Sequence, residues 1–321
     1  MTLRSNGLTI DVRHADRLCY AMQQNAVPWL FGIELHNGGE RDLDGLLVRV
    51  TLGDFATAAE LGVDGLLVGE RRELGAPDLR LLGDAFAGLL EAVRADLVVT
   101  ATAEGEDEPL ARWSAPIDVL AGNEWPGLDV LPALLAAFVQ PNHPVLAPVL
   151  RAAGERLCAL TGDGSLDGMQ RSDPERVRAM VEALYDAVCA VGIRYVSEPP
   201  SFERTGQKVR LPEQVFGERL ATCLDLALAF AALCEHVGLL PFVVLLHGHA
   251  CVGVRLEPGG GGDVCFGSAQ ELRKAVAAGS MVVIETTVAC LEPAPTFDRA
   301  LHAADRRLLG DADLVAAVDV A

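Results

Sequence analysis

Positive charge is scarce in this sequence. Its 321 residues include 26 Lys and Arg against 45 Asp and Glu, which gives a formal net charge of -19 at pH 7. A surface of this sign repels phosphate backbones and anionic membrane leaflets. We therefore expect the chain to have no direct nucleic-acid partner and no membrane partner.

Long uncharged apolar runs are also missing. The richest run, LDLALAFAALCEHVG, carries Asp225, Glu235 and His236. No stretch approaches the roughly 18 to 20 apolar residues that cross a membrane, and the N-terminal residues lack the apolar region of a signal peptide. These absences predict a cytoplasmic protein, in which cysteines are kept as reduced thiols.

The eight cysteines form no C-x-x-C pair, so a structural zinc site is poorly supported. The chain also has no G-x-x-x-x-G-K-[ST] segment of the kind that holds ATP phosphates. Free cysteines are usually small buried hydrophobic residues, and we expect this of most of the eight. The sequence predicts no cofactor and no resident metal ion.

The length favours about two domains of roughly 150 residues each. Residues 1–122 contain short runs with β-branched residues, such as GLTIDVR, VPWLFGIELH and GLLVRVTLG, which predict strands. The turn-like residues 36–40 predict a hairpin between the last two runs. Residues 77–95 fit either a helix or strands around a loop. The simplest architecture is an accessory β-sandwich that resembles immunoglobulin-like modules.

Residues 123–321 have a more helical composition. A helical lead-in over 128–192 includes a helix expected to start at Ser172-Asp173-Pro174-Glu175 and to stop at Gly192. A second helix, over about 222–236, is apolar almost all round and should lie at the centre of the domain. Three strand-like runs follow it, FVVLL, ACVGVRL and MVVIETTV.

Cys223, His249 and Glu285 occur in the order that a thiol hydrolase or acyltransferase needs. Cys223 opens the apolar helix, where unpaired N–H groups are expected to lower the pKa of its thiol. His249 begins the second strand run and can take and return the thiol proton. Glu285 can fix the imidazole tautomer, with Asp263 as the rival acid. The alternative for each is structural: a buried cysteine, a turn histidine and a solvent-facing acid.

Several neighbouring side chains have candidate roles. Gln207 and Gln214 are amides that could donate to an oxyanion, together with the backbone N–H of the nucleophile; a surface amide in a loop is the alternative for each. Asp225, two residues beyond the thiol, is expected to cap the helix or to pair with Arg210 or Arg219.

A competing metal interpretation uses His247, His249 and Cys251. A spacing of two would place them on one face of a strand, where they would resemble the three ligands of an open zinc site. The turn at Gly248 should break that alternation, and no fourth ligand is evident. The thiol interpretation is therefore favoured.

The run from Glu218 to Leu256 resembles the transglutaminase-like superfamily. In that family the nucleophile lies in a G-x-C segment, the base in H-A-x-V-x-V and the acid in D-P-T or a similar segment. The matching positions here are Ala221-Thr222-Cys223, His249-Ala250-Cys251-Val252-Gly253-Val254 and Glu285-Thr286-Thr287. The resemblance implies a Cys-His-Glu triad in an α+β fold, with the nucleophile helix packed on a small antiparallel sheet. Alanine in place of the glycine, and Glu in place of Asp, depart from the family pattern.

A longer resemblance covers NEWPGLDVLPALLAAFVQPNHPVLAPVL, the segment from RYVSEPP to EHVGLLP, and LLHGHACVGV. These runs resemble an uncharacterised bacterial family of large proteins, in which a β-rich module precedes this domain and helicase-type ATPase regions often follow. The resemblance implies association with an ATPase or helicase region or partner, and a role in bacterial defence. We expect the chain to be either a fragment of such a protein or a stand-alone relative.

Two functions follow from these observations. The first is an intracellular thiol protease or amidase that acts on a peptide or isopeptide amide, with hydrolysis favoured over cross-linking. Its partner is then a protein or peptide substrate. The second is a non-catalytic module of a larger protein, which binds or regulates another protein.

Overall fold

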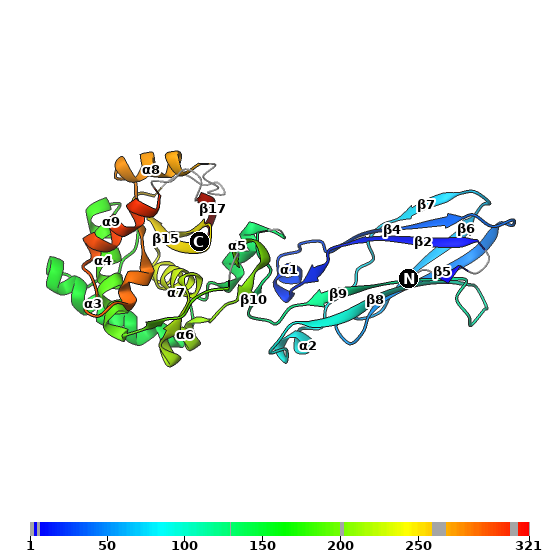
Figure 1. The fold of residues 1–321 in the computed structure, drawn as a ribbon, viewed down its shortest axis with the longest axis horizontal. Helices are drawn as coiled ribbons and strands as arrows, with labels where there is room; N and C mark the ends of the chain where they lie inside the picture. The colour runs from blue at the N-terminus through cyan, green and yellow to red at the C-terminus, as the bar shows by residue number, and fades with distance from the viewer. Residues whose placement is uncertain are drawn as a thin grey trace. The chain divides into compact units, whose positions relative to one another are not determined.

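A computed structural model shows a mixed α+β protein, with 36% of residues in helices and 31% in strands. The chain divides into two compact units, Met1–Pro126 and Gly127–Ala321, which Figure 1 draws as ribbons. The expected boundary after residue 122 lies shortly before this division. Among the described residues, no helix is both long and apolar enough to cross a membrane. The structure describes residues 3–4, 7–128, 130–199, 202–258, 268–308 and 314–320.

The first unit holds two sheets (Figure 1). The larger has the order β1-β9-β8-β5-β6, with β3 also paired to β9, and the smaller has the order β2-β4-β7. The pairs are antiparallel except that β3 runs parallel to β9. The elements of this unit are β1 (Leu3–Arg4), β2 (Leu8–His14), β3 (Arg17–Leu18), α1 (Tyr20–Gln24), β4 (Leu30–Asn37), β5 (Leu43–Leu52), β6 (Ala59–Leu66), β7 (Arg71–Leu74), α2 (Gly83–Ala87), β8 (Val93–Ala103), β9 (Ala111–Val119) and β10 (Glu124–Trp125).

The predicted strands of this unit are present, and their burial alternates as a half-buried sheet requires. In β5, Val48 and Val50 are buried while Arg49 between them faces solvent. Residues 77–95, left open between helix and strand, contain the short helix α2 and the start of β8.

The predicted hairpin at residues 36–40 is wrong. Strand β4 pairs with β2 and β7, whereas β5 pairs with β6 and β8, so this turn carries the chain from one sheet to the other. Asn37 anchors the crossing, because its buried side-chain amide donates to the backbone oxygens of Arg41 and Leu66 at 2.9 and 3.0 Å. A side chain tied to the neighbouring sheet is not visible in local turn propensity.

The second unit is built around an antiparallel sheet of order β16-β15-β14-β17. Its strands are β11 (Arg194–Tyr195), β12 (Gln207–Lys208), β13 (Leu220–Ala221), β14 (Leu240–Leu246), β15 (His249–Arg255), β16 (Met281–Ile284) and β17 (Leu314–Asp319). Its helices are η1 (Pro132–Phe138), η2 (Pro144–Leu146), α3 (Ala147–Thr161), α4 (Pro174–Val191), α5 (Phe202–Thr205), α6 (Pro212–Glu218), α7 (Cys223–His236), α8 (Ala269–Ala277), η3 (Thr286–Cys290) and α9 (Phe297–Arg307), where η marks a 3-10 helix.

Helix α7 lies in the centre of this unit, as predicted (Figure 1). It packs on β14 and β15 and also contacts α4, and its residues from Cys223 to Cys234 are all buried. Leu272 of α8 and Ala304 of α9 join an apolar cluster with Phe242 of β14. Helices therefore cover both faces of β14, which explains why its sequence is continuously apolar rather than alternating.

The helix boundaries of the lead-in follow local signals. The Asp173 side chain accepts hydrogen bonds from the N–H groups of Glu175 and Arg176, and Gly192 ends α4 with a φ of 72°. Both ends of this helix were predicted. The preceding run LPALLAAFV forms the 3-10 helix η1 rather than an α-helix.

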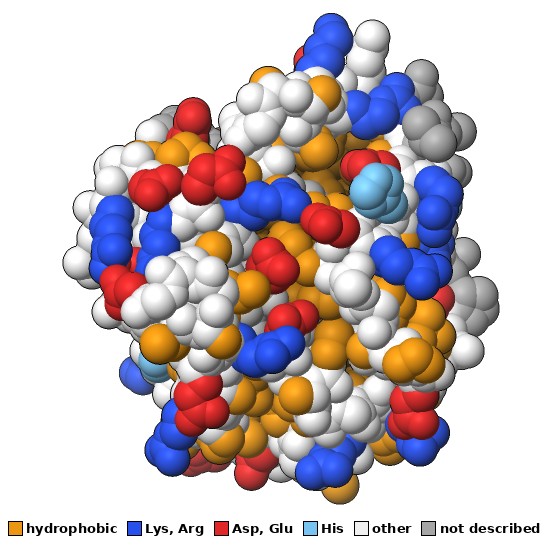
Figure 2. All heavy atoms as spheres, turned by 90° about the vertical axis from the view of Figure 1, so that its left-hand side faces the viewer, with side chains coloured by type: hydrophobic (Ala, Val, Ile, Leu, Met, Phe, Trp, Pro, Cys, Tyr) orange, Lys and Arg blue, Asp and Glu red, His pale blue; other side chains and the backbone are white. Residues whose placement is uncertain are grey.

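Charges of both signs share the surface of the second unit. Figure 2 shows a face on which basic and acidic side chains are interspersed around apolar patches. Arg156 of α3 pairs with Asp186 of α4, and Arg178 of α4 pairs with Asp298 of α9.

Candidate active site

Helix α7 begins with Cys223, the predicted nucleophile, as its first residue. Thr222 caps the helix: its hydroxyl accepts from the Asp225 N–H at 3.3 Å, and the Asp225 carboxylate accepts from the Thr222 N–H at 2.9 Å. Asp225 is fully buried and also accepts from the backbone N–H and the guanidinium of Arg210, at 2.8 and 3.2 Å. The predictions that Asp225 caps the helix and that it pairs with Arg210 are both confirmed.

His249 is the first residue of β15 and is buried. Its position depends on the two-residue turn between β14 and β15. The Glu203 carboxylate, itself buried, accepts from the Gly248 N–H at 3.3 Å and lies 3.7 Å from Nδ1 of His247. Glu203 thus anchors the turn that delivers the imidazole, a role that the sequence analysis did not identify.

The Glu285 carboxylate contacts the imidazole of His249. His249 Nε2 lies 2.7 Å from Glu285 Oε2, and the other carboxylate oxygen accepts from the Thr287 N–H and hydroxyl at 3.1 and 2.6 Å. The Arg307 guanidinium pairs with Oε2 as well. Burial alone would raise the pKa of this carboxyl, but the hydrogen bonds from His249 and Thr287 and the nearby cations lower it to about 2.

The predicted setting of Glu285 needs a correction. Strand β16 ends at Ile284, and Glu285 is the N-cap of the 3-10 helix η3, where its side chain bonds the Thr287 N–H. A strand residue has its side chain set by the pleat, whereas a cap residue has it set by the helix that follows. The rival acid, Asp263, lies outside the described residues, as do its neighbours at 259–267.

The thiol lies beside the imidazole. Cys223 Sγ, a ring nitrogen of His249 and a carboxylate oxygen of Glu198 all lie within 4.8 Å of one another. Because Glu285 holds Nε2 of His249, Nδ1 is the nitrogen left for the thiol. The structure therefore brings together all three residues predicted to form the triad.

The prediction that the thiol pKa is lowered is wrong. Burial raises the pKa of Cys223 well above its usual value, and the negative charge of Glu198 raises it further. Hydrogen bonds from backbone N–H groups act in the opposite direction and do not offset these two effects. The thiol is thus neutral and covered in this conformation.

Tyr195 and Glu198 lie beside the thiol and line the adjacent pocket. Strand β11 pairs in parallel with β13, which leads directly into the nucleophile helix, and this pairing aligns Tyr195 with Ala221. The Tyr195 hydroxyl donates to the Glu198 carboxylate. Sequence analysis missed both residues; an acid and an aromatic residue in a Pro-punctuated segment just upstream of the thiol were the available signal.

A pocket of about 350 Å³ opens next to this cluster. His249 and Glu198 contribute to its wall, so it reaches the imidazole and the acid that faces the thiol. Arg307 adds a cation and Leu291 adds an apolar side chain. The lining residues are Tyr195, Glu198, Gly248, His249, Thr287, Val288, Cys290, Leu291 and Arg307.

The two amides proposed for the oxyanion differ in position. The buried Gln207 donates through Nε2 to the Thr222 hydroxyl at 3.1 Å, so it lies at the start of the nucleophile helix. Gln214 instead accepts from the Leu211 N–H at 3.3 Å and caps helix α6. Of the two, only Gln207 is tied to the residue that precedes the thiol.

The metal interpretation from His247, His249 and Cys251 does not match the geometry. The His247 side chain is 61% exposed and turns to Glu203. Within the described part of the chain, two mixed groups bring candidate ligand atoms within 4.8 Å of one another: Glu198 with Cys223 and His249, and His249 with Cys251 and Glu285.

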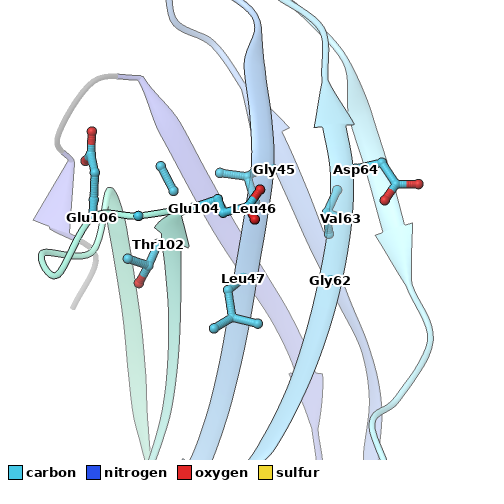
Figure 3. Close-up of a pocket in the computed structure, with 11 residues that line it drawn as sticks. Gly45, Leu46, Leu47, Gly62, Val63, Asp64, Thr102, Glu104 and Glu106 are labelled. Carbon is cyan, nitrogen blue, oxygen red and sulfur yellow. The ribbon is translucent and has the colours of Figure 1, made fainter.

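A second pocket, of about 430 Å³, lies on the first unit (Figure 3). Strands β5, β6 and β8 and the turn after β8 form it, and its lining includes Leu47 and three acids, Asp64, Glu104 and Glu106. Its lining holds acids but no cysteine or histidine, so it offers no nucleophile with a base.

Comparisons with protein-family models and with curated proteins find no match to this chain.

Proposed function

We propose that this chain is a thiol hydrolase of the transglutaminase-like type, which cleaves a peptide or isopeptide amide. One observation carries the proposal: the Cys223 thiol lies within 4.8 Å of a ring nitrogen of His249, whose Nε2 is 2.7 Å from Glu285. A nucleophile, a base and a group that orients the base are what covalent amide hydrolysis requires.

Each residue has a defined step in this reaction. His249 takes the Cys223 proton at Nδ1 as the sulfur attacks the carbonyl carbon, while Glu285 holds the tautomer and stabilises the imidazolium. The protonated imidazole then gives its proton to the departing amine, which leaves a thioester on the sulfur. Water, deprotonated by the same imidazole, hydrolyses the thioester and restores the thiol.

The covered thiol corresponds to a resting form of the enzyme. A substrate carbonyl reaches Cys223 only when neighbouring side chains move aside, since the thiol has no exposed surface, and we assign that movement to Tyr195 and Glu198, which line the adjacent pocket. That movement also removes the acid that raises the thiol pKa. The same movement therefore exposes the Cys223 thiol and removes a cause of its raised pKa.

The accessory roles belong to the same proposal. The two-sheet first unit serves as an immunoglobulin-like docking module for a protein substrate, and the second unit carries out the chemistry in the cytoplasm. We place the domain boundary near residues 122–126, and we expect association with an ATPase or helicase region in bacterial defence.

Substrate cleavage by the intact chain tests this function. Wild-type protein and Cys223→Ala are incubated with a peptide library and a bacterial proteome, and new termini are mapped by mass spectrometry. We expect cleavage by the wild type and at least a thousandfold loss in the variant. Cys158→Ala, at an exposed cysteine, is the matched control and should remain fully active. Equal cleavage by wild type and Cys223→Ala would refute the proposal.

The second candidate function is a non-catalytic binding module. The fully buried, neutral thiol is the specific observation that favours it. The same variants separate the two functions, because a binding module retains its biological activity in Cys223→Ala whereas a hydrolase loses it.

A further inference from the structure

The group of Glu198, Cys223 and His249 has the composition of a zinc site. Thiolate, imidazole and carboxylate are the three ligand types that zinc takes in proteins. Their ligand atoms lie within 4.8 Å of one another. Around a tetrahedral zinc ion the ligand atoms are roughly 3.5 Å apart, given bonds of about 2.0 to 2.3 Å.

Second partners already orient two of the three side chains. Glu285 lies 2.7 Å from Nε2 of His249, so Nδ1 would be the nitrogen that binds the ion, in the carboxylate–histidine–metal arrangement of many zinc sites. The Tyr195 hydroxyl donates to the Glu198 carboxylate and restricts its rotation. Side chains that cluster on a surface by chance would lack these two orienting hydrogen bonds.

The site also has an entry path and an open position. Glu198 and His249 line the pocket of about 350 Å³, while Cys223, the third ligand, is fully buried next to them. Three protein ligands leave the fourth position for water or for a ligand in the pocket. The other mixed group, around Glu285, is a poorer site because the Arg307 cation and Thr287 already occupy that carboxylate.

We propose that Glu198, Cys223 and His249 bind one zinc ion, which closes the site by occupying the nucleophile and its base together. The zinc site stands on geometry alone, whereas its inhibitory effect rests on the proposed hydrolase function. Binding releases the thiol proton, forms the zinc–sulfur bond and fills the imidazole nitrogen that would accept that proton. Removal of the ion by a chelator reverses each of these steps.

Direct metal binding by the full 321-residue chain is the test. Metal-free protein is titrated with zinc chloride against a chromophoric chelator, and then with cobalt(II), whose thiolate charge-transfer absorption reports a metal–sulfur bond. We expect one ion per chain with that absorption. Cys223→Ser and Glu198→Gln should weaken binding by at least about a hundredfold, and Glu285→Gln by about tenfold to a hundredfold. Circular dichroism establishes that each variant is folded.

Two substitutions serve as matched controls. His247→Gln changes an exposed histidine two residues from the proposed ligand, and Cys158→Ser changes an exposed cysteine; both should bind zinc as the wild type does. Absence of zinc binding by the wild type, or undiminished binding by folded Cys223→Ser and Glu198→Gln, would overturn the site. Because the assay measures no hydrolysis, a catalytically inert protein that binds zinc would refute only the proposed function.

Discussion

At the scale of single residues, Glu285 is the most heavily used side chain of the site. It holds the imidazole, the two donors of Thr287 and the Arg307 guanidinium, and these contacts keep it ionised although it is almost completely buried. Cys223 differs from Glu285 in its charge state. Burial and a neighbouring acid keep Cys223 neutral, so the site contains an ionised carboxylate at Glu285 and an uncharged thiol at Cys223.

Acid should weaken the fold through Glu285. Its folded-state pKa is about 2, below the value of about 4.3 expected in the unfolded chain. A lowered pKa contributes stability that is present above about pH 4.3 and is lost as the pH falls toward 2, by up to about 3 kcal/mol. The stability gap between wild type and Glu285→Gln, from urea unfolding, should be larger at pH 7 than at pH 3. A gap that grows on acidification would contradict this account.

The Glu198→Gln substitution should make the thiol more reactive. Removing the negative charge beside Cys223 lowers the thiol pKa, so more thiolate is present at a given pH below that pKa. We expect the pH profile of iodoacetamide alkylation at Cys223 to move to lower pH, with a rate at pH 8 about threefold to tenfold higher. Glu213→Gln changes an exposed acid and should leave the profile in place. An unchanged or alkaline-shifted profile for Glu198→Gln would be inconsistent with this role.

At the scale of elements, the start of α7 fixes the position of Cys223. The cap formed by Thr222 and Asp225 sets where the helix begins. The pairing of β11 with β13 aligns Tyr195 with Ala221, just before this helix start. Close packing likewise constrains the pairing of β15 with β14. Gly253 of β15 lies against Phe242 of β14, and a Cβ atom there would be 2.1 Å from the aromatic ring, so only glycine fits.

Loss of the α7 cap should destabilise the second unit. Asp225→Ala removes the acceptor for two backbone N–H groups and for the Arg210 guanidinium in a fully buried setting. We expect the free energy of unfolding in urea to fall by about 2 to 4 kcal/mol. Asp298→Ala, which breaks an exposed pair with Arg178, should change it by less than about 1 kcal/mol. Similar losses in the two variants would show that the cap has no special role.

The sequence predicted those elements whose boundaries and burial depend on neighbouring residues. The capping residues of α4 and α7, the apolar surface of α7 and the two-residue turn before His249 all follow from neighbouring sequence. The Cys-His-acid order placed three distant residues in one site because each begins or follows a recognisable element. Glu285 was predicted as the acid of the site, although it was placed in a strand and in fact caps the 3-10 helix η3.

Features that depend on distant contacts were not predictable in this way. Glu198 reaches the thiol because β11 pairs with β13, and the thiol pKa then follows from burial and from that acid rather than from the helix start. Glu203 acts on a turn more than forty residues away. The chain crossing at Asn37 likewise depends on a bond to another sheet. Contacts between residues far apart in the chain leave no periodic pattern in the sequence from which they could be predicted.

At the scale of the whole molecule, the excess of negative charge matters most. With a formal net charge of -19, the folded chain repels itself at low ionic strength. The exposed ion pairs offset little of this, since each contributes about 0 to 1 kcal/mol.

Added salt should therefore stabilise the protein. Raising sodium chloride from 10 to 300 mM shortens the Debye length from about 30 Å to below about 10 Å and screens the repulsion. We expect Tm to rise by about 2 to 5 °C in differential scanning calorimetry. A decrease in Tm would mean that attractive ion pairs, rather than net repulsion, dominate the charge interactions.

In the proposed reaction, Cys223 is a nucleophile that His249 activates. The most direct test is covalent labelling of the intact chain with peptide-linked chloroacetamides, read by intact mass and peptide mapping. The account predicts a single adduct on Cys223, lost in His249→Ala and retained in His247→Ala. Labelling of exposed Cys158 while Cys223 stays unmodified, or an adduct on Cys223 that forms equally fast without His249, would contradict it.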